Sequence, residues 1–392
     1  MSSAVPHVPD PQRSPDLQRS DRRADRARPL IAVDRALGEL RRGGMAVIFG
    51  GEAGAGLHLL VQAAEATTPH SLGQITELAA ATPMLAITLR RAAALNLPAG
   101  RGPVAALQVP DGMHAQDVRD IADPLSAISF RLPPFAYPAK DAEPCLAAAV
   151  ELTKLARLLP AALVATVAVR PGDIPGWLAS HDLVAVSVDD VAAYQENAAR
   201  TLKPVSQARV PLAGAEDARI VAYRPSDGGI EHLAIVIGEP KEPVLVRLHS
   251  ECFTGDLLGS LRCDCGDQLR GAIQQIAREG AGVLIYLAQE GRGIGLVNKL
   301  RAYQLQDDGA DTVEANEQLG FDADERVYMP AAEMLKDLGF QRVRLMTNNP
   351  EKVTALAHFG IDVVERVPHA FPANPHNERY LATKANKSGH LF

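Results

Sequence analysis

Three cysteines lie close together in the sequence and could bind a metal ion. Cys252, Cys263 and Cys265 fall within fourteen residues, and no fourth cysteine lies near them. Structural zinc sites are usually closed by four protein ligands, whereas catalytic zinc sites keep one position open for water. Three thiolates therefore predict a catalytic metal site, and thiolate ligands favour zinc over magnesium or calcium.

The alternative is that these cysteines are small hydrophobic residues of a core. Their neighbours Asp264, Gly266 and Asp267 are polar or flexible, which makes metal binding the better interpretation. Nucleobase deaminases also use zinc, with a His-x-Glu followed by Pro-Cys-x-x-Cys. The chain has Cys263-x-Cys265 and no preceding His-x-Glu, so the deaminase class is the weaker zinc hypothesis.

The segments around the cysteines predict strands that alternate with helices. An apolar stripe of Leu269, Ile273 and Ile276 predicts a helix directly after the cysteines, and Pro350 suits the first turn of another helix. Strands are expected at 45–49, 161–169, 244–248, 282–287 and 343–346, and further helices from about residue 30 to Gly43-Gly44 and at 146–159. The predicted fold class is α/β (α+β), with two domains that each contain a mixed sheet and packed helices.

The length of 392 residues is enough for two domains with separate cores. The proline- and charge-rich residues 1–28 predict a disordered tail. A first domain is expected over 29–200, a linker at Lys203-Pro204, and a second domain over 205–392.

Composition excludes several classes of protein. The net charge of −7 argues against nucleic-acid or membrane binding, and no apolar run reaches the roughly 20 residues of a membrane span. Four cysteines, three of them clustered, indicate a reducing compartment, and the N-terminus has no apolar signal-peptide core. We expect a cytoplasmic protein.

Two glycine-rich stretches resemble phosphate-binding loops only superficially. Residues 50–56 lack the Lys and Ser or Thr that should follow, because Leu57-His58 stands there. Residues 291–295 follow a predicted strand and open a helix, but they lack the dinucleotide-binding pattern. A strand-to-helix loop is the better interpretation of 50–56.

The cysteines belong to a longer ordered series of motifs. The series reads RLHSECFTGD at 247–256, LRCDCG at 261–266, QEGRGIGL at 289–296, DTVEAN at 311–316, DER at 324–326, TNNPEK at 347–352, NPHNERYL at 374–381 and GHL at 389–391. From about residue 205 to the end, the chain strongly resembles GTP cyclohydrolase II of riboflavin biosynthesis. That family comprises hydrolases acting on cyclic amidine C–N bonds.

The resemblance implies a reaction and its site. GTP would be hydrolysed to 2,5-diamino-6-(5-phospho-ribosylamino)pyrimidin-4(3H)-one, formate and pyrophosphate, the first step of riboflavin biosynthesis. Cys252, Cys263 and Cys265 would hold one Zn2+, whose hydroxide would attack C8 of guanine, and Mg2+ would bind the departing pyrophosphate. The resemblance places eight residues around GTP: Arg247, Glu251, Gln268, Glu290, Arg292, Thr312, Thr347 and Lys352.

Three further residues would take part in catalysis. By the resemblance, Tyr303 would orient the attacking water or the ring-opened intermediate, and Asp324 would act as an acid or base. Arg326 is assigned in the family as the group that attacks the α-phosphorus. A guanidinium stays protonated in proteins, so stabilisation of phosphate charge is the better interpretation of Arg326.

The segments VDRAL at 33–37, LRRGG at 40–44 and AVEL at 149–152 carry a second resemblance. In outline the first half of the chain resembles 3,4-dihydroxy-2-butanone 4-phosphate synthase, to which GTP cyclohydrolase II is fused in many bacteria. The acidic magnesium-binding loop of that family is replaced by the glycine stretch 50–56, and its Gly-His-Thr-Glu by Pro144-Cys145-Leu146-Ala147. Residues 29–200 therefore predict an inactive domain kept for folding, dimerisation or regulation. Cys145 is predicted to be a buried thiol rather than a fourth zinc ligand, and the family's habit predicts a homodimer.

Two other functions remain open from the sequence. The chain could stop at the formylated intermediate, although Tyr303 at its expected position argues against this. It could also be a nucleotide-binding regulatory module without turnover, against which Asp324, Arg326 and the three cysteines argue.

Overall fold

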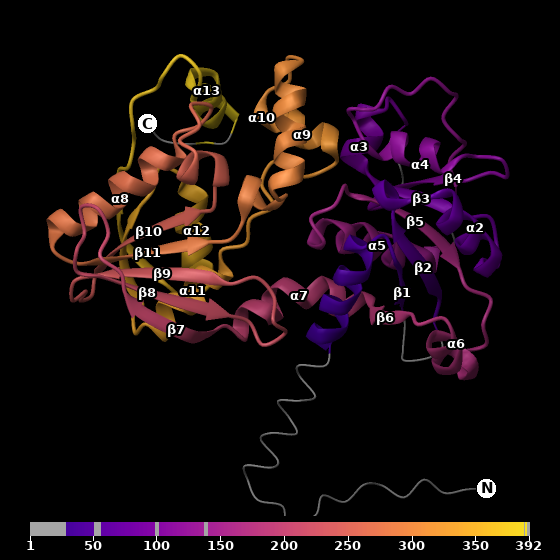
Figure 1. Cartoon of the computed structure of the whole chain (residues 1–392), viewed down its shortest axis with the longest axis horizontal. Coiled ribbons are helices and arrows are strands. Elements are labelled where there is room, and N and C mark those ends of the chain that lie inside the picture. Colours follow the sequence, from indigo (N-terminus) through magenta and orange to yellow (C-terminus); the bar gives the residue numbers. More distant parts are fainter. Residues whose placement is uncertain (1–28, 51–55, 99–101, 137–139, 388, 390–392) are drawn as a thin grey trace, which may run out of the picture.

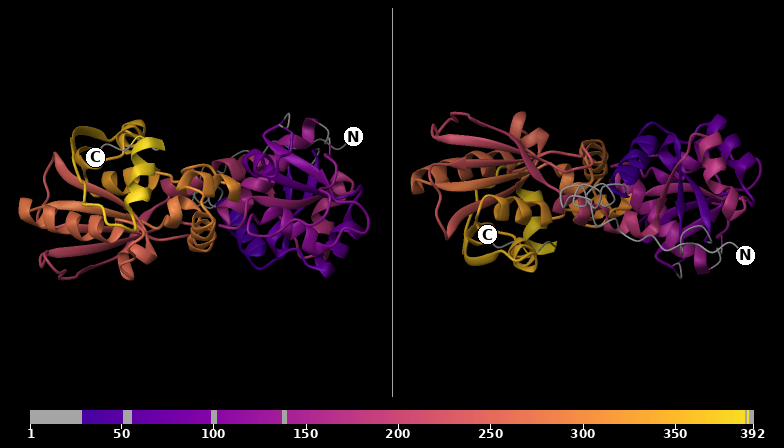
Figure 2. Two further views of the ribbon diagram at one scale, coloured as in Figure 1. Left: turned by 90° about the horizontal axis from the view of Figure 1, so that it is seen from above. Right: turned by 90° about the horizontal axis from the view of Figure 1, so that it is seen from below.

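The computed structural model describes residues 29–50, 56–98, 102–136, 140–387 and 389. The expected tail 1–28, most of the glycine stretch 50–56 and the final His390-Leu391 lie outside these residues. The described chain forms two mixed sheets with packed helices, which confirms the predicted fold class. Figures 1 and 2 show an elongated molecule with one sheet toward each end.

The first sheet has six strands in the order β4-β3-β5-β2-β1-β6. Only the pair β1 and β6 is parallel among these strands, and the other neighbours run antiparallel. The strands are β1 (Met45–Phe49), β2 (His58–Ala63), β3 (Met84–Thr88), β4 (Val104–Gln108), β5 (Ala161–Thr166) and β6 (Val184–Ser187). The helices are 29–41, α2 (Pro69–Leu78), α3 (Leu89–Ala94), α4 (Ala115–Ala122), α5 (Glu143–Leu155), α6 (Ile174–Ser180) and α7 (Val188–Arg200), with short turns η1 (Ala64–Ala66), η2 (Lys140–Ala142) and η3 (Pro171–Asp173).

Both faces of this sheet are covered, because alternate residues of its strands enter two different cores. Leu60 and Leu163 belong to one apolar cluster, whereas their neighbours Leu59 and Val164 belong to the other. Cys145 is fully buried in the second of these clusters, as the sequence predicts.

The second sheet has seven strands in the order β13-β12-β10-β11-β9-β8-β7. The first four of these are parallel, and the last three continue antiparallel. The strands are β7 (Lys203–Arg209), β8 (Ala218–Arg224), β9 (His232–Ile237), β10 (Val244–Ser250), β11 (Gly282–Leu287), β12 (Arg342–Met346) and β13 (Asp362–Val367). The helices are α8 (Cys265–Glu279), α9 (Leu296–Asp307), α10 (Thr312–Leu319), α11 (Met329–Asp337), α12 (Pro350–His358) and α13 (Glu378–Lys387).

Helix α8 covers one face of this sheet, and α11 and α12 cover the other. Ile276 of α8 packs with Leu245 and Leu284, whereas Leu335 of α11 packs with Val246 among others. The prediction of a linker at Lys203-Pro204 is wrong, because both residues lie in the exposed edge strand β7. A proline fits there because an edge strand leaves backbone N–H groups outside the ladder.

Helices α9 and α10 leave the second sheet and pack against the first half of the chain (Figure 1). Leu305 of α9, Leu319 of α10 and the nearby Phe321 are buried in the same apolar cluster as β3 and β5. The two halves therefore share a core. None of the helices in the described ranges is long and apolar enough to cross a membrane.

Candidate active site

The candidate site lies where three neighbouring parallel strands end. Glu251 and Cys252 follow β10, Glu290 follows β11, and Thr347 follows β12. The central strand β10 pairs with β11 on one side and with β12 on the other. Helix α8, which follows β10, covers one face of the sheet, and α12, which follows β12, covers the other. Ligands of α/β sheets bind at such points, beyond the carboxyl ends of the strands.

A pocket at this edge collects nearly all the residues that the sequence predicts for the site. Its wall includes Arg247, Glu251, Cys252, Cys263, Cys265, Gln268, Glu290, Arg292, Tyr303, Thr312, Arg326, Thr347 and Lys352. Asp324 is absent from that wall and lies behind Arg326, whose Nε donates to its Oδ1 at 2.8 Å. The structure thus brings together predicted residues that are spread between Arg247 and Lys352 in the sequence.

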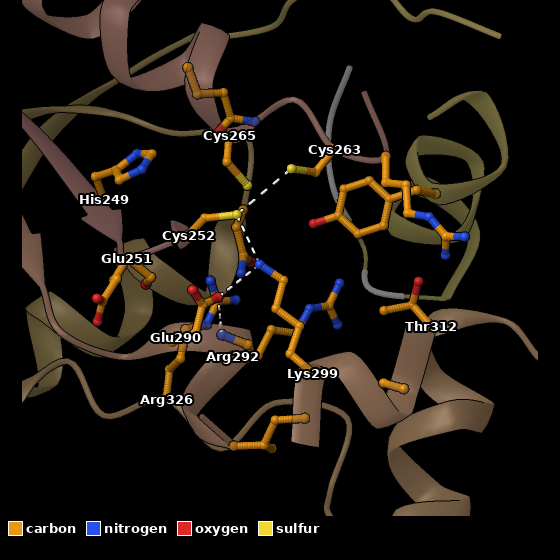
Figure 3. Close-up of a pocket in the computed structure, with 18 of the residues that line it drawn as sticks. His249, Glu251, Cys252, Cys263, Cys265, Glu290, Arg292, Lys299, Thr312 and Arg326 are labelled. Carbon is orange, nitrogen blue, oxygen red and sulfur yellow. Dashed lines mark hydrogen bonds and ion pairs between the residues drawn. The ribbon is translucent and has the colours of Figure 1, made fainter. Parts of the chain in front are cut away.

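The three cysteine sulfurs converge at one end of the pocket (Figure 3). Their Sγ atoms all lie within 4.8 Å of one another, and those of Cys252 and Cys263 are 3.7 Å apart. Cys252 precedes the π-helical turn η4 (Phe253–Leu257), and Cys265 is the first residue of α8. Such single π-turns are frequent at functional sites.

Gly255 allows the cysteines to approach one another. A Cβ atom at this position would lie 2.8 Å from Sγ of Cys263 and 3.0 Å from Sγ of Cys252. Gly266 is equally constrained, since its Cβ would meet the carbonyl oxygen of Gly255. Because Gly255 has no side chain, the three sulfur atoms can lie close enough together to bind one metal ion such as zinc.

The sulfur cluster carries concentrated negative charge next to a buried cation. Hydrogen bonds from Cys263 and Cys265, and then Lys299, hold the pKa of Cys252 well below its ordinary value. The hydrogen bond with Cys252 raises the pKa of Cys263. Lys299 therefore favours the thiolate form of Cys252, and metal binding would displace thiol protons from the cluster.

Lys299 connects the cysteines to the loop after β11. Its Nζ donates to Sγ of Cys252 at 3.1 Å, to Oγ1 of Thr254 at 2.9 Å and to Oε1 of Glu290 at 2.9 Å. Glu290 in turn accepts from the backbone N–H of Phe253 at 2.6 Å. This buried lysine was missed by sequence reasoning, because a lysine in a helix ordinarily points into water.

The loop that carries Glu290 and Arg292 has an unusual backbone. Gly291, Arg292 and Gly293 have φ values of 64°, 63° and 100° in the turn η5 (Glu290–Gly293), and Gly295 has a φ of 86°. A non-glycine residue in the left-handed region costs about 1–2 kcal/mol of conformational free energy. Residues in such strained conformations cluster at functional sites. The glycines are needed for this path, and Arg292 donates from it to the carbonyl of Ala323 at 3.2 Å.

Arg247 lies on the floor of the pocket and is almost completely buried. Its Nη1 donates to the carbonyl of Met346 at 2.9 Å, and Nη2 donates to Gln268, whose amide donates to Asp264. Burial lowers the pKa of Arg247 to about 10, and its Nε has no hydrogen-bond partner among the described residues. An unpaired buried N–H on a residue that lines the pocket is suited to an anionic ligand.

A second cationic group lies where β12 meets α12. Lys352 is buried and donates to the carbonyl of Leu248 at 2.9 Å, and Thr347 accepts from the N–H of Asn349 at 3.0 Å. Asn349 caps α12 by accepting from the N–H of Glu351 at 2.9 Å. The positive end of the helix dipole therefore adds to the charge of Lys352.

Tyr303 and Thr312 close the opposite wall. The hydroxyl of Tyr303 lies 3.5 Å from Oγ1 of Thr254, and the guanidinium of Arg262 lies 5.0 Å from its ring centroid. Thr312 is the first residue of α10, whose N-cap is Asp311. Both predicted residues therefore come from helices that the first half of the chain supports.

Two buried histidines of the wall were also missed from the sequence. His249 Nε2 lies 3.0 Å from Oδ1 of Asp256, which also receives the hydroxyl of Tyr286 through its second oxygen. His369 Nε2 lies 2.9 Å from the carbonyl of Gln268. Neither histidine belongs to a periodic pattern in the sequence, so only the fold reveals that both are buried.

Comparisons with known proteins show the family to which the chain belongs. A protein-family model for GTP cyclohydrolase II matches residues 203–368. The chain is 56% identical over 366 residues to GTP cyclohydrolase-2 of Azospirillum brasilense, a match that covers 93% of this chain and 94% of that protein. This chain is therefore an enzyme of the hydrolase class and belongs to the GTP cyclohydrolase II family.

Other relatives are longer or more distant. The chain is 47% identical over 253 residues to the riboflavin biosynthesis protein RibBA of Synechocystis sp., covering 62% of this chain and 45% of that protein. A solved two-domain 3,4-dihydroxy-2-butanone 4-phosphate synthase from A. baumannii aligns over 86% of this chain and 99% of its own, with 20% identity and a TM-score of 0.37.

Proposed function

We propose that this chain is a zinc-dependent GTP cyclohydrolase II that converts GTP to the diaminopyrimidinone ribosyl phosphate, formate and pyrophosphate, the first step of riboflavin biosynthesis. The observation that carries the proposal is the pairing of three convergent sulfurs with a cation-lined pocket. Cys252, Cys263 and Cys265 would hold the Zn2+. When bound, the zinc would act as a Lewis acid and lower the pKa of a water molecule.

The carboxylates of Glu251 and Glu290 suit the guanine end of the substrate. Carboxylate oxygens accept hydrogen bonds from the ring N–H and amino groups of guanine. Burial, and then repulsion from Glu290, raises the pKa of Glu251. A ligand that donates N–H groups would relieve this repulsion, so guanine would bind here in preference to adenine, which lacks that donor pair.

The cations of the pocket suit the triphosphate end. Arg247, Arg292, Arg326 and Lys352 all line the pocket, and guanidinium groups bind phosphate oxygens in pairs. Mg2+ would accompany the pyrophosphate, held chiefly by phosphate oxygens.

Arg326 would stabilise charge on the phosphate and would not itself attack phosphorus. Burial opposes its charge, but the hydroxyl of Tyr328 and the hydrogen-bonded Asp324 together raise the pKa of Arg326 above its ordinary value. The hydrogen bond from Arg326 likewise lowers the pKa of Asp324 despite its burial. Asp324 would therefore act as an ionised carboxylate that orients Arg326 and could accept a proton, and Tyr303 would orient the attacking water.

The first half of the chain would have no activity on a sugar phosphate. Cys145, at the place of the expected catalytic motif, lies in an apolar core, and a Cβ on Gly50 would be 2.9 Å from its Sγ. This packing supports a structural role for residues 29–200. Formation of dihydroxybutanone phosphate from ribulose 5-phosphate and Mg2+ would contradict it.

One assay tests the function directly. Purified protein is incubated with GTP and Mg2+, and formate and pyrophosphate are measured separately. We expect both products in equal amounts, and Cys263→Ser should abolish formate. Pyrophosphate alone would indicate the truncated reaction, and GTP binding without either product would indicate a regulatory module.

A further inference from the structure

Arg157 belongs to the first half of the chain but contacts both ends of the active-site loop of the second half. Its Nη2 donates to the carbonyl of Ala288 at 2.7 Å, directly after β11. Its own carbonyl accepts from Nδ2 of Asn298 at 3.1 Å, in the first turn of α9. Gly295 packs between these contacts, since a Cβ there would lie 3.1 Å from Cβ of Arg157.

The backbone of Arg157 is in a conformation that favours glycine. Helix α5 ends in a Schellman motif, in which Arg157 N–H donates to Lys154 at 2.8 Å and Leu158 N–H donates to Thr153 at 3.0 Å. Arg157 takes the left-handed position of this motif with a φ of 60°. Glycine is the usual residue there because it has no Cβ, so an arginine is held at a conformational cost.

The segment between the two contacts carries much of the catalytic apparatus. Glu290 and Arg292 lie between Ala288 and Asn298, and Lys299, which donates to Cys252, follows Asn298 directly. Asn298 is fully buried and also donates to the carbonyl of Ile294 at 3.0 Å. The two bonds of Arg157 therefore fix where this segment begins and where it enters α9.

A neighbouring contact braces the same loop from the same helix. Lys154 of α5 lies 2.7 Å from Oε1 of Glu325, and the N–H of Glu325 donates to the carbonyl of Arg292 at 3.0 Å. Two residues near the end of α5 thus support this loop, Arg157 directly and Lys154 through Glu325.

We propose that Arg157 is a positioning residue for the cyclohydrolase site, through which the first half of the chain holds Glu290, Arg292 and Lys299 in their working arrangement. The inference rests on the proposed function for its activity readout. It assigns a specific task to a half that would itself be inactive.

The left-handed backbone allows a test that separates positioning from folding. Arg157→Ala removes the side chain and keeps the Cβ, whereas Arg157→Gly removes the side chain and also the conformational strain. We expect kcat/KM for formate release to fall about 10- to 100-fold in both variants, since small displacements of catalytic groups have effects of that size. We also expect Arg157→Gly to melt at a higher temperature than Arg157→Ala.

Arg41→Ala is the matched control. Arg41 lines the same cavity between the two halves, but its Nε donates to the carbonyl of Ala156, within the first half. The control should keep wild-type kcat/KM. Because Arg157 also borders that cavity, guanidinium ion should restore part of the activity of Arg157→Gly and should not affect Arg41→Ala.

Amide hydrogen exchange of residues 288–299 provides a readout that does not need turnover. We expect faster exchange in this segment in both Arg157 variants and not in Arg41→Ala. Wild-type kcat/KM together with wild-type exchange in Arg157→Gly would overturn the inference. Absence of formate from the wild-type protein would instead overturn the proposed function, and the exchange measurement would still decide the role of Arg157.

Discussion

The ammonium group of Lys299 donates to the sulfur of Cys252 at 3.1 Å, in a part of the pocket that water scarcely reaches. Three thiolates around a divalent zinc ion leave one net negative charge, and Lys299 is placed to balance it. The same ammonium group holds the carboxylate of Glu290 at 2.9 Å. The cysteine cluster and the loop after β11 are thus electrostatically linked through one side chain.

Replacing Lys299 should weaken metal binding and activity together. We expect Lys299→Met to lower zinc affinity about 10- to 100-fold, as loss of groups that support metal ligands generally does. Competition with a coloured chelator would measure this affinity. Lys336→Met, which breaks only a surface pair with Glu333, is the control and should keep the wild-type affinity. Equal zinc affinity in both variants would contradict the role of Lys299.

A methyl group at Gly255 should disrupt the cysteine cluster. The added Cβ in Gly255→Ala would overlap the sulfurs of Cys252 and Cys263, so we expect loss of bound zinc and of formate release. Gly73→Ala is the control, because Gly73 lies inside helix α2 with no atom near its Cβ direction. That variant should retain zinc and gain up to about 1 kcal/mol of stability. Metal analysis of both purified proteins checks the prediction.

The sequence predicts the residues that could do chemistry better than the residues that hold them in place. Many of the motif residues follow a strand or open a helix, as Cys252 follows β10 and Cys265 opens α8, and such positions carry recognisable spacing. Lys299 and Arg157 carry no such signal. The role of Lys299 arises from its burial beside Cys252 and Glu290, and that of Arg157 from its bond to Ala288, which is 131 positions away in the sequence.

The boundary between the halves shows a similar limit. The strands at 45–49 and 282–287 are predicted from local apolar patterns and are confirmed as β1 and β11. The burial of Leu305 and Leu319 in the core of the first half cannot be predicted from such patterns. An apolar helix face does not specify which sheet it will cover.

Removal of the first half should therefore expose an apolar surface. A chain of residues 201–392 would lose the partners of Leu305, Leu319 and Phe321, all buried in the shared core. We expect this fragment to aggregate, to bind a hydrophobic dye, and to lose most of its GTP turnover. Adding a separately expressed first half should suppress dye binding. A monomeric, dye-negative fragment with full activity would contradict the shared core.

Two buried histidines should make the protein less stable in mild acid. Burial, followed by repulsion from nearby arginines, lowers the pKa of His232 and of His369 to about 4 from an ordinary 6.5. The unfolded chain therefore binds more protons than the folded protein between pH 4 and 6.5. The free energy of unfolding is highest above this window and falls as the pH falls through it, by up to about 3 kcal/mol for each histidine.

The variant His369→Gln tests this dependence, because its amide can still donate to the carbonyl of Gln268 and does not titrate. Urea titration measures the unfolding free energy of both proteins at pH 6.5 and at pH 4.5. The loss of unfolding free energy between these two pH values should be smaller in His369→Gln than in the wild type, by about 2–3 kcal/mol. His358→Gln, at the exposed end of α12, controls for the loss of a histidine. The test uses the change of the unfolding free energy with pH, so a lower stability of His369→Gln at neutral pH does not affect the result. Equal pH dependence in wild type and His369→Gln would show that His369 has the same pKa in the folded protein and in the unfolded chain, which contradicts the lowered pKa.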